Sequence, residues 1–151
     1  MIKRILHIFL LTVTTCVFAN ANANAQVDST DTLSIVTFNE IQYKVVGKVK
    51  KGKASFYSLK FEGRKTATGN KFSHQNYTAA SNTFPLGTLV LVTNPKNKQF
   101  VVVKINDRMS KSMSKKGRIV DLTSLAAKEL GIFKLGIGSV WVQKVVKKAD
   151  K

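Results

Sequence analysis

Two aspartates, Asp107 and Asp121, lie in an otherwise strongly basic stretch of the chain, KINDRMSKSMSKKGRIVDLTSLAAKELG (104–131). Carboxyl groups can act as general acid or general base in catalysis. They can equally be structural residues, because aspartate also favours turns and helix starts. Each aspartate follows an apolar run, VVVKIN (101–106) or RIV (118–120), so each side chain would be held at a rigid strand end. The residues alone leave both interpretations open.

Few other acidic residues accompany the two aspartates. Between residues 54 and 146 the others are Glu62 and Glu129, against fifteen lysines and arginines. Glu129 lies beside Lys128 on an expected helix and is interpreted as a solvated residue, and Glu62, within KFEGRK, as a turn residue. The aspartates are therefore the main candidates for acid–base chemistry.

Several common catalytic and metal-binding patterns are missing from the sequence. It has no Cys/His cluster with metal-ligand spacing, no glycine-rich phosphate loop and no H-E-x-x-H motif. The segment GNKFSHQNYTAAS (69–81) contains Ser73, His74 and Ser81, but without a G-x-S-x-G turn it does not indicate a serine hydrolase. We expect the His74 ring to meet solvent, and we expect neither a metal ion nor a cofactor.

Short strand-like runs separated by turn signals dominate the region that carries these residues. The expected strands are ASFYSL, TLVLVTN, FVVVKIN, RIVDL and SVWVQKVV (54–59, 88–94, 100–106, 118–122 and 139–146). NPKNK (94–98) indicates a hairpin between the second and third strands. Thr123 can cap a short helix over SLAAKEL, with Gly131 at its left-handed C-terminal position. Near-continuous apolar runs such as FVVVKI are typical of strands buried on both faces, as in a closed barrel.

The first 25 residues have the pattern of an export signal, with a basic start, an apolar run from Ile5 to Ala19 and small residues before an expected cut after Ala25. The apolar run is too short to span a bilayer comfortably, so we expect no transmembrane segment. Cys16, the only cysteine, lies within this run, and its lipidation is the less favoured alternative. We therefore expect an exported protein of the periplasm or cell envelope, without disulfides.

The remainder divides into a polar and basic N-terminal arm (26–53), one compact domain (54–147) and a basic tail (148–151). Residues 32–46 of the arm have enough β-branched and aromatic residues for a strand or two, but the solvated run GKVKKGK follows, so the arm is expected to be a weakly ordered lead-in. Loss of the signal would lower the net charge only from +17 to +15, so the surface favours polyanionic partners. For an exported chain these are cell-wall polymers and anionic lipids rather than nucleic acid, although excess lysine can also serve solubility alone. We expect the protein to be a monomer.

The motifs of the compact domain resemble those of the rare lipoprotein A (RlpA) family of septal ring lytic transglycosylases. ASFY (54–57) is similar to the family's A-S-[WY]-Y, and GRKTATG (63–69) to its G-R-x-T-A-x-G. YTAASNTFPLGTLVLVTN (77–94) resembles T-A-A-H-x-T-L-P-x-G-T-x-V-x-V-T-N. VKINDR (103–108) and RIVDLTSLAA (118–127) resemble V-R-I-N-D-R and R-I-I-D-L-S-x-x-A-A. The similarity covers nearly the whole expected domain.

This resemblance implies a mainly β fold, a six-stranded double-psi β-barrel with one or two short helices. It also implies that the substrate is peptidoglycan, cut within glycan strands between N-acetylmuramic acid and N-acetylglucosamine. In a lytic transglycosylase the muramic acid 6-hydroxyl attacks its own anomeric carbon and leaves a 1,6-anhydro end. One carboxyl can serve that reaction first as acid and then as base, whereas an ordinary glycosidase normally needs two.

The catalytic pattern of the family is incomplete in this sequence. Where active relatives carry Glu, Asp and His, this chain has Asn70, Ser73 and Ser81, and neither Asn nor Ser can be a general acid near neutral pH. Asp107 is similar to the N-D-R aspartate of the family, and Asp121 to the H-F-D-L-S aspartate of the related expansin barrels. We therefore predict that Asp121 is the acid and base, and that Asp107 is its electrostatic or hydrogen-bonding partner.

Further glycan contacts and two other kinds of function stay open. Candidate substrate-binding residues from the matched motifs are Tyr57, Thr66, Asn70, Ser73, Ser81, Asn106 and Arg108. Trp141 alternates with valines in a strand and is interpreted as a core residue rather than a sugar contact.

The alternatives to an enzyme are a barrel that binds peptidoglycan, or loosens it as expansins do, without cutting it, and a basic protein that engages another polyanion.

Overall fold

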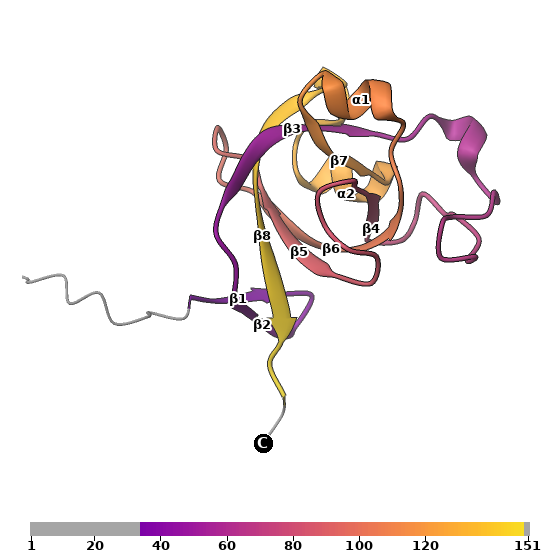
Figure 1. Ribbon diagram of the computed structural model, residues 1–151. Coiled ribbons are helices and arrows are strands. Elements are labelled where there is room, and N and C mark those ends of the chain that lie inside the picture. The colour runs from indigo at the N-terminus through magenta and orange to yellow at the C-terminus, as the bar shows by residue number, and fades with distance from the viewer. Residues whose placement is uncertain (1–33, 150–151) are drawn as a thin grey trace, which may run out of the picture. The chain divides into compact units, whose positions relative to one another are not determined.

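The computed structural model describes residues 34–149, shown in colour in Figure 1. In chain order the elements are β1 (Ile35–Phe38), β2 (Ile41–Val45), β3 (Lys50–Phe56), the 3-10 helix η1 (Leu59–Phe61), β4 (Thr78–Ala80), β5 (Leu89–Thr93), β6 (Phe100–Asp107), α1 (Lys111–Lys115), β7 (Arg118–Leu122), α2 (Ser124–Glu129), the 3-10 helix η2 (Phe133–Leu135) and β8 (Gly138–Lys147). No helix in this part of the chain is long and apolar enough to cross a membrane. The expected export signal and Cys16 lie outside the described residues.

Six of the strands close into a barrel. The sheet order is β1-β2-β8-β3-β7-β4-β6-β5, and an additional pairing between β8 and β5 closes the ring. Strand β3 runs parallel to its neighbour β7, and β4 runs parallel to its neighbour β6. All the other paired strands run antiparallel. The predicted six-stranded double-psi β-barrel with short helices is confirmed.

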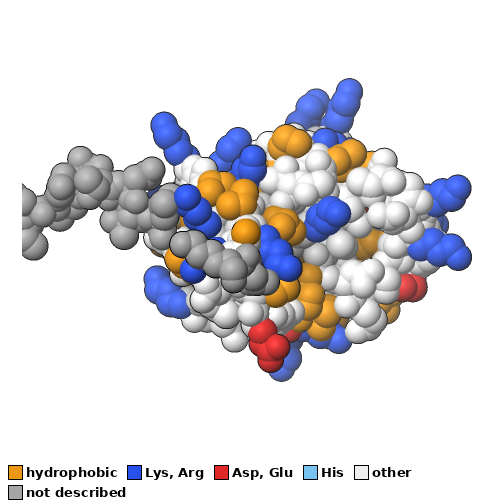
Figure 2. All heavy atoms as spheres, turned by 90° about the horizontal axis from the view of Figure 1, so that it is seen from below, with side chains coloured by type: hydrophobic (Ala, Val, Ile, Leu, Met, Phe, Trp, Pro, Cys, Tyr) orange, Lys and Arg blue, Asp and Glu red, His pale blue; other side chains and the backbone are white. Residues whose placement is uncertain are grey.

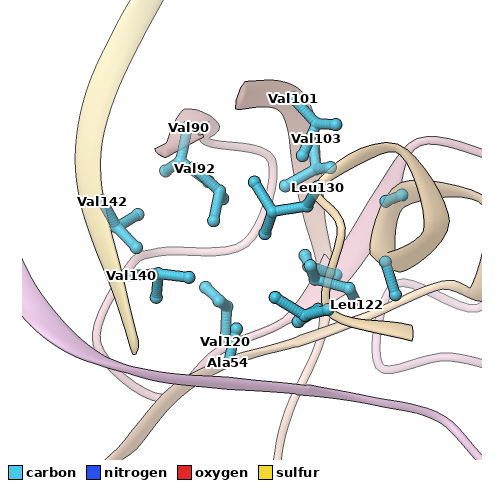
Figure 3. Packing of buried hydrophobic residues seen from close by; sticks show 14 of the residues in the cluster. Ala54, Val90, Val92, Val101, Val103, Val120, Leu122, Leu130, Val140 and Val142 are labelled. Carbon is cyan, nitrogen blue, oxygen red and sulfur yellow. The ribbon is translucent and has the colours of Figure 1, made fainter. Parts of the chain in front are cut away.

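The barrel interior is filled by aliphatic side chains from its strands. In Figure 3, valines of β5, β6, β7 and β8 point toward one another, with Leu122 and Leu130 beside them. On β5 and β6 every second residue faces this interior, because side chains alternate along a strand. The residues between them, Leu91 and Val102, are also buried, in a second cluster with Tyr43 outside the barrel. The near-continuous apolar runs therefore reflect strands with two covered faces.

The cover on the outside is the β1–β2 hairpin. It pairs with the end of β8, where Tyr43 is aligned with Lys147 and Val45 with Val145. The segment expected to be a weakly ordered lead-in thus supplies two strands of the sheet, and the expected domain start at Ala54 lies inside β3. The lysine-rich run before Ala54 looked like a linker because its lysines face solvent while their backbone pairs with β8.

The expectation for α2 is confirmed and the one for Trp141 is wrong. Thr123 caps α2, its side-chain oxygen accepting from the Ala126 backbone N–H at 3.4 Å. Trp141 is 38 % exposed, because its neighbours Val140 and Val142 occupy the inward positions of β8. The alternation along the strand was predicted correctly, but Trp141 was assigned to the inner face of β8 and lies on its outer face.

Candidate functional site

The barrel brings Asp107 and Asp121 to the same level through the strand between them. β4 lies between β6 and β7, and Ala80 of β4 is aligned with Asp107 on one side and with Asp121 on the other. The residue between the two aspartates therefore carries only a methyl group. The two carboxyls interact electrostatically, and each contributes to the field at the Tyr57 hydroxyl.

Asp121 is a buried carboxyl, only 6 % exposed. Its Oδ1 accepts a hydrogen bond of 2.5 Å from the hydroxyl of Ser55, the residue aligned with it on the parallel strand β3. Burial raises the pKa of Asp121 above its ordinary value; the Ser55 hydroxyl and the charge of Arg118 oppose this, and the charge of Asp107 adds to it. A carboxyl that keeps its proton to higher pH is suited to act as a general acid.

The raised pKa of Asp121 also has a cost for folding that can be measured. In the folded state Asp121 binds its proton more tightly than in the unfolded chain, so stability falls as the pH rises from about its ordinary pKa of 3.8 through the raised value. We expect Asp121→Asn to be more stable than the wild type at pH 7 and equally stable below pH 3.8. Urea unfolding across this pH range measures the difference; a variant that is less stable at pH 7 would contradict it.

Asp107 has donors on both of its oxygens. The Tyr57 hydroxyl donates to Oδ2 at 2.8 Å. The backbone N–H groups of Ala67 and Arg108 donate to Oδ1 at 2.9 and 2.8 Å. Both oxygens of this carboxyl therefore act as hydrogen-bond acceptors. Asp107 thus joins the end of β6, the residue after β3 and the loop around Ala67 into one hydrogen-bonded unit.

Tyr57 is buried, and its ring packs against Phe72 and Phe61 with centroid separations of 4.3 and 5.5 Å. Burial raises the pKa of the Tyr57 hydroxyl well above its usual range, and the hydrogen bond and negative charge of Asp107 add to this. The hydroxyl therefore stays protonated at neutral pH and remains a donor to Asp107.

Tyr57→Phe isolates this hydrogen bond. We expect the variant to fold with a free energy of unfolding lowered by about 1–3 kcal/mol, because Asp107 Oδ2 loses its donor while the aromatic packing stays. Chemical denaturation measures the change. Tyr43→Phe, at a tyrosine of similar burial in the second cluster, is the matched control. Equal losses of stability in the two variants would show that the hydrogen bond to Asp107 does not stabilise the fold.

The loop that carries Thr66 and Asn70 lies against Asp107. The Thr66 N–H and hydroxyl both donate to the Asn70 carbonyl, at 2.9 and 3.1 Å. The Thr68 N–H donates to the Asn106 carbonyl at 3.2 Å, next to the Ala67 contact with Asp107. The structure thus brings three predicted binding residues, Thr66, Asn70 and Asn106, next to the aspartate, with Asn70 exposed and the other two buried.

Ser81 and Arg108 have their polar atoms engaged with backbone groups. Ser81 is completely buried, and its hydroxyl donates to the Ile119 carbonyl at 2.7 Å. The Ser81 N–H donates to the Asp107 carbonyl at 3.0 Å. Arg108 Nη1 donates to the carbonyls of Ser81 and Phe84. These two predicted binding residues hold the chain after β4 against the strands that carry the aspartates.

The histidine is buried, so the expectation that its ring meets solvent is wrong. His74 Nδ1 lies 2.8 Å from the Ser124 hydroxyl at the start of α2, and Phe72 packs on the ring edge-on. Glu62 Oε2 accepts from the His74 backbone N–H at 2.8 Å. That bond lowers the pKa of Glu62, with a smaller contribution from the Ser73 hydroxyl. The predicted binding residue Ser73 thus belongs to this group with Glu62, and nothing in the sequence indicated that the group packs on α2.

Ser55 is the site residue that the sequence reasoning missed. It lies two residues before Tyr57, and residues two apart on an extended chain share a face. Each of the two hydroxyls meets one of the two aspartates, Ser55 meeting Asp121 and Tyr57 meeting Asp107. The signal was present in the motif ASFY, whose second and fourth residues both carry hydroxyl groups.

Comparison with known families assigns the chain. A family model described as lytic transglycolase matches residues 49–142. The chain belongs to the lytic transglycolase family. Two relatives, each named endolytic peptidoglycan transglycosylase RlpA, come from Pasteurella multocida (strain Pm70) and Haemophilus influenzae (strain ATCC 51907 / DSM 11121 / KW20 / Rd). They are 48 % identical over 99 residues and 46 % identical over 95 residues, so the resemblance to RlpA is confirmed.

These alignments cover 66 % and 63 % of this chain but 33 % and 32 % of the relatives, so the chain spans about one third of their length. Among solved structures, the Streptomyces papain inhibitor superposes with a TM-score of 0.52 at 21 % identity, over 67 % of this chain and 96 % of its own. At that identity the similarity concerns the fold alone.

The three residues that stand where the resemblance implies Glu, Asp and His have different surroundings. Asn70 is exposed, Ser73 is half-buried beside Glu62, and Ser81 is completely buried. None of the three brings an ionisable group of its own to the aspartates. The carboxyls aligned with Ala80 on the neighbouring strands are those of Asp107 and Asp121.

Proposed function

We propose that this protein cleaves the glycan strands of peptidoglycan as a lytic transglycosylase, with Asp121 as its acid and base. The observation that carries the proposal is the buried carboxyl of Asp121, whose pKa is raised, set beside Asp107 in a barrel of the lytic transglycolase family. The names of the RlpA relatives support the choice of substrate and of reaction.

In this mechanism one carboxyl is used twice. Protonated Asp121 gives its proton to the glycosidic oxygen as the bond from the muramic acid anomeric carbon to that oxygen breaks. The 6-hydroxyl of the same muramic acid then attacks the anomeric carbon, and its proton returns to the Asp121 carboxylate. No water is consumed and the acid is regenerated. Asp107, held by three donors, stabilises the positive charge that develops on the sugar between the two steps.

The surroundings of the reaction follow from the same proposal. We place the protein in the periplasm or cell envelope because its N-terminal sequence has an export pattern. Its basic surface favours an anionic polymer over neutral partners. We propose that it acts as a monomer. Peptidoglycan glycan strands are the proposed partner, with no role for nucleic acid. Tyr57, Thr66, Asn70 and Asn106 are the proposed glycan contacts closest to Asp107, and Ser73, Ser81 and Arg108 support their loops.

A second candidate function is a barrel that binds or loosens peptidoglycan without cutting it. The observation that favours it is the replacement of the three family residues by Asn70, Ser73 and Ser81. In that case the hydrogen bonds of Asp107 and Asp121 would hold glycan, or only the fold.

Digestion of peptidoglycan in ¹⁸O-labelled water separates these functions. Purified sacculi and peptide-stripped strands are incubated with the protein, and the released sugars are analysed by mass spectrometry. We expect 1,6-anhydro ends that carry no ¹⁸O, because the attacking oxygen comes from the substrate. New reducing ends that contain ¹⁸O would indicate a hydrolase, and bound protein without new ends would indicate the non-catalytic alternative.

A further inference from the structure

Basic side chains are spread widely over the molecule, as Figure 2 shows for one face, so positive charge alone does not mark a binding surface. One region combines charge with exposed apolar side chains. It consists of Leu135, Ile137 and Trp141, with Lys51 and Lys53 on one side and Lys96 and Lys98 on the other. We call these seven residues the lysine-flanked face.

Strand pairing explains why this face is continuous. Ser139 and Trp141 lie two apart on β8 and share its outer side, and they are aligned with Lys53 and Lys51 of β3. The opposite flank comes from the β5–β6 turn. Its Lys98 ammonium lies 5.6 Å from the centre of the Trp141 ring, and the Lys51 ammonium lies 5.7 Å from it.

A small cavity of about 170 Å³ extends the face beyond Ser139. It is lined by Lys53, Asn94, Lys96, Ile132, Leu135, Ile137, Gly138 and Ser139, none of which is acidic. Gly136, with φ of 75°, makes the turn between η2 and β8. The residues on either side of this turn project outward, so Leu135 is 65 % exposed and Ile137 43 % exposed.

We propose that the lysine-flanked face docks this protein on an anionic lipid bilayer. Exposed aliphatic side chains beside an exposed tryptophan, surrounded by lysines, fit the boundary between lipid headgroups and acyl chains. The lysines meet the negative headgroups, and their aliphatic stems lie along the apolar side chains. A glycan strand would suit the tryptophan and the lysines, but the C–H faces of its sugar rings would cover less of the exposed aliphatic side chains of Leu135 and Ile137 than acyl chains would.

The face is separate in sequence and in contacts from the aspartate site. Its residues come from the first half of β3, the β5–β6 turn, η2 and the start of β8, whereas the aspartates contact the end of β3 and the loop of residues 66–69. Docking by this face therefore does not require the proposed catalytic activity and can be tested without it.

Vesicle sedimentation tests the proposal with matched variants of the whole protein. We expect binding to vesicles of phosphatidylglycerol and phosphatidylcholine, and little binding to vesicles of phosphatidylcholine alone. Lys51→Gln, Lys96→Gln and Lys98→Gln together should weaken binding by roughly a hundred-fold, since each lysine near an anionic surface contributes roughly five-fold. The control replaces Lys111 and Lys115 of α1 and its C-cap residue Lys116 by Gln, which changes net charge equally, and should have a clearly smaller effect.

The aliphatic part has its own pair of variants. Leu135→Ser with Ile137→Ser should weaken vesicle binding at least about ten-fold. Leu59→Ser, at a leucine of η1 that is also exposed, should leave it unchanged. Absence of vesicle binding, or equal losses in the face variants and their controls, would overturn the proposal. If vesicles are not bound, binding to peptide-stripped glycan strands decides what the face contacts instead. Loss of glycan binding in the face variants would then assign the face to glycan.

Discussion

Asp121→Asn is expected to lower kcat/KM for the formation of 1,6-anhydro ends by about 10²–10⁴-fold, the range typical for loss of a general acid–base group. Asparagine keeps the shape of the side chain and an oxygen that can accept from Ser55, so the surroundings stay in place. It cannot give up a proton to the leaving oxygen, nor accept one from the attacking 6-hydroxyl. Both steps of the proposed mechanism therefore fail at once.

The control for this variant is Glu129→Gln, the same chemical change at an exposed carboxyl on α2. We expect the control to keep wild-type activity. Because Asp121→Asn should be more stable than the wild type at pH 7, unfolding cannot account for its lost activity. An Asp121→Asn protein that retains more than roughly a tenth of the wild-type rate would assign the proton transfers to another group.

Leu122→Ala is expected to lower the free energy of unfolding by about 2–5 kcal/mol. Leu122 ends β7 directly after Asp121, and its side chain is completely buried in the barrel core. Truncation removes apolar burial and leaves a cavity in an interior where strands close around it on every side, so neighbouring side chains can fill little of the space. Urea or guanidinium denaturation with an unchanged m-value measures the loss.

Leu59→Ala is the matched control for Leu122→Ala. Leu59 is 74 % exposed in η1, and its truncation should change stability by less than about 0.5 kcal/mol. Similar losses for the two leucines would mean that the barrel interior is not the main source of stability.

The barrel strands that the sequence predicted best are those with strong local signals. β5 and β6 are long β-branched runs joined by NPKNK, and β7 was predicted with the same bounds as observed. β4 was missed because its three residues, Thr78–Ala80, carry no β-branched run. It is a strand because it pairs with β6 on one side and β7 on the other. Such pairing is a property of the whole fold.

The basic segment between the two aspartates contains an element that the sequence reasoning did not identify. MSKSMSKKG (109–117) includes the helix α1. Ser110 caps this helix, its hydroxyl accepting from the Met113 N–H at 3.4 Å. Serine before a run without glycine or proline was a signal for a helix start, but a single turn of helix is easily overlooked.

For the candidate site, the sequence predicted that the two aspartates lie at strand ends, but not which residues they contact. Strand ends placed Asp107 and Asp121 correctly on β6 and β7. The partnership of Asp121 with Ser55 joins residues 66 apart in the chain, and it depends on the parallel alignment of β3 with β7. Burial raises the pKa of Asp121. The basic residues around Asp121 in the sequence suggest the opposite, a lowered pKa, because burial cannot be read from the sequence.

The central claim is that Asp121 suffices without the glutamate that the resemblance to RlpA implies at the position of Asn70. The most direct test compares the wild type with Asn70→Glu on the same peptidoglycan, with 1,6-anhydro ends counted by mass spectrometry. Asn70 is exposed, so the substitution fits the fold, whereas histidine at the buried Ser81 would not. We predict that the wild type forms anhydro ends and that Asn70→Glu changes the rate less than about ten-fold. A wild type that forms none, beside an Asn70→Glu variant that does, would contradict the account.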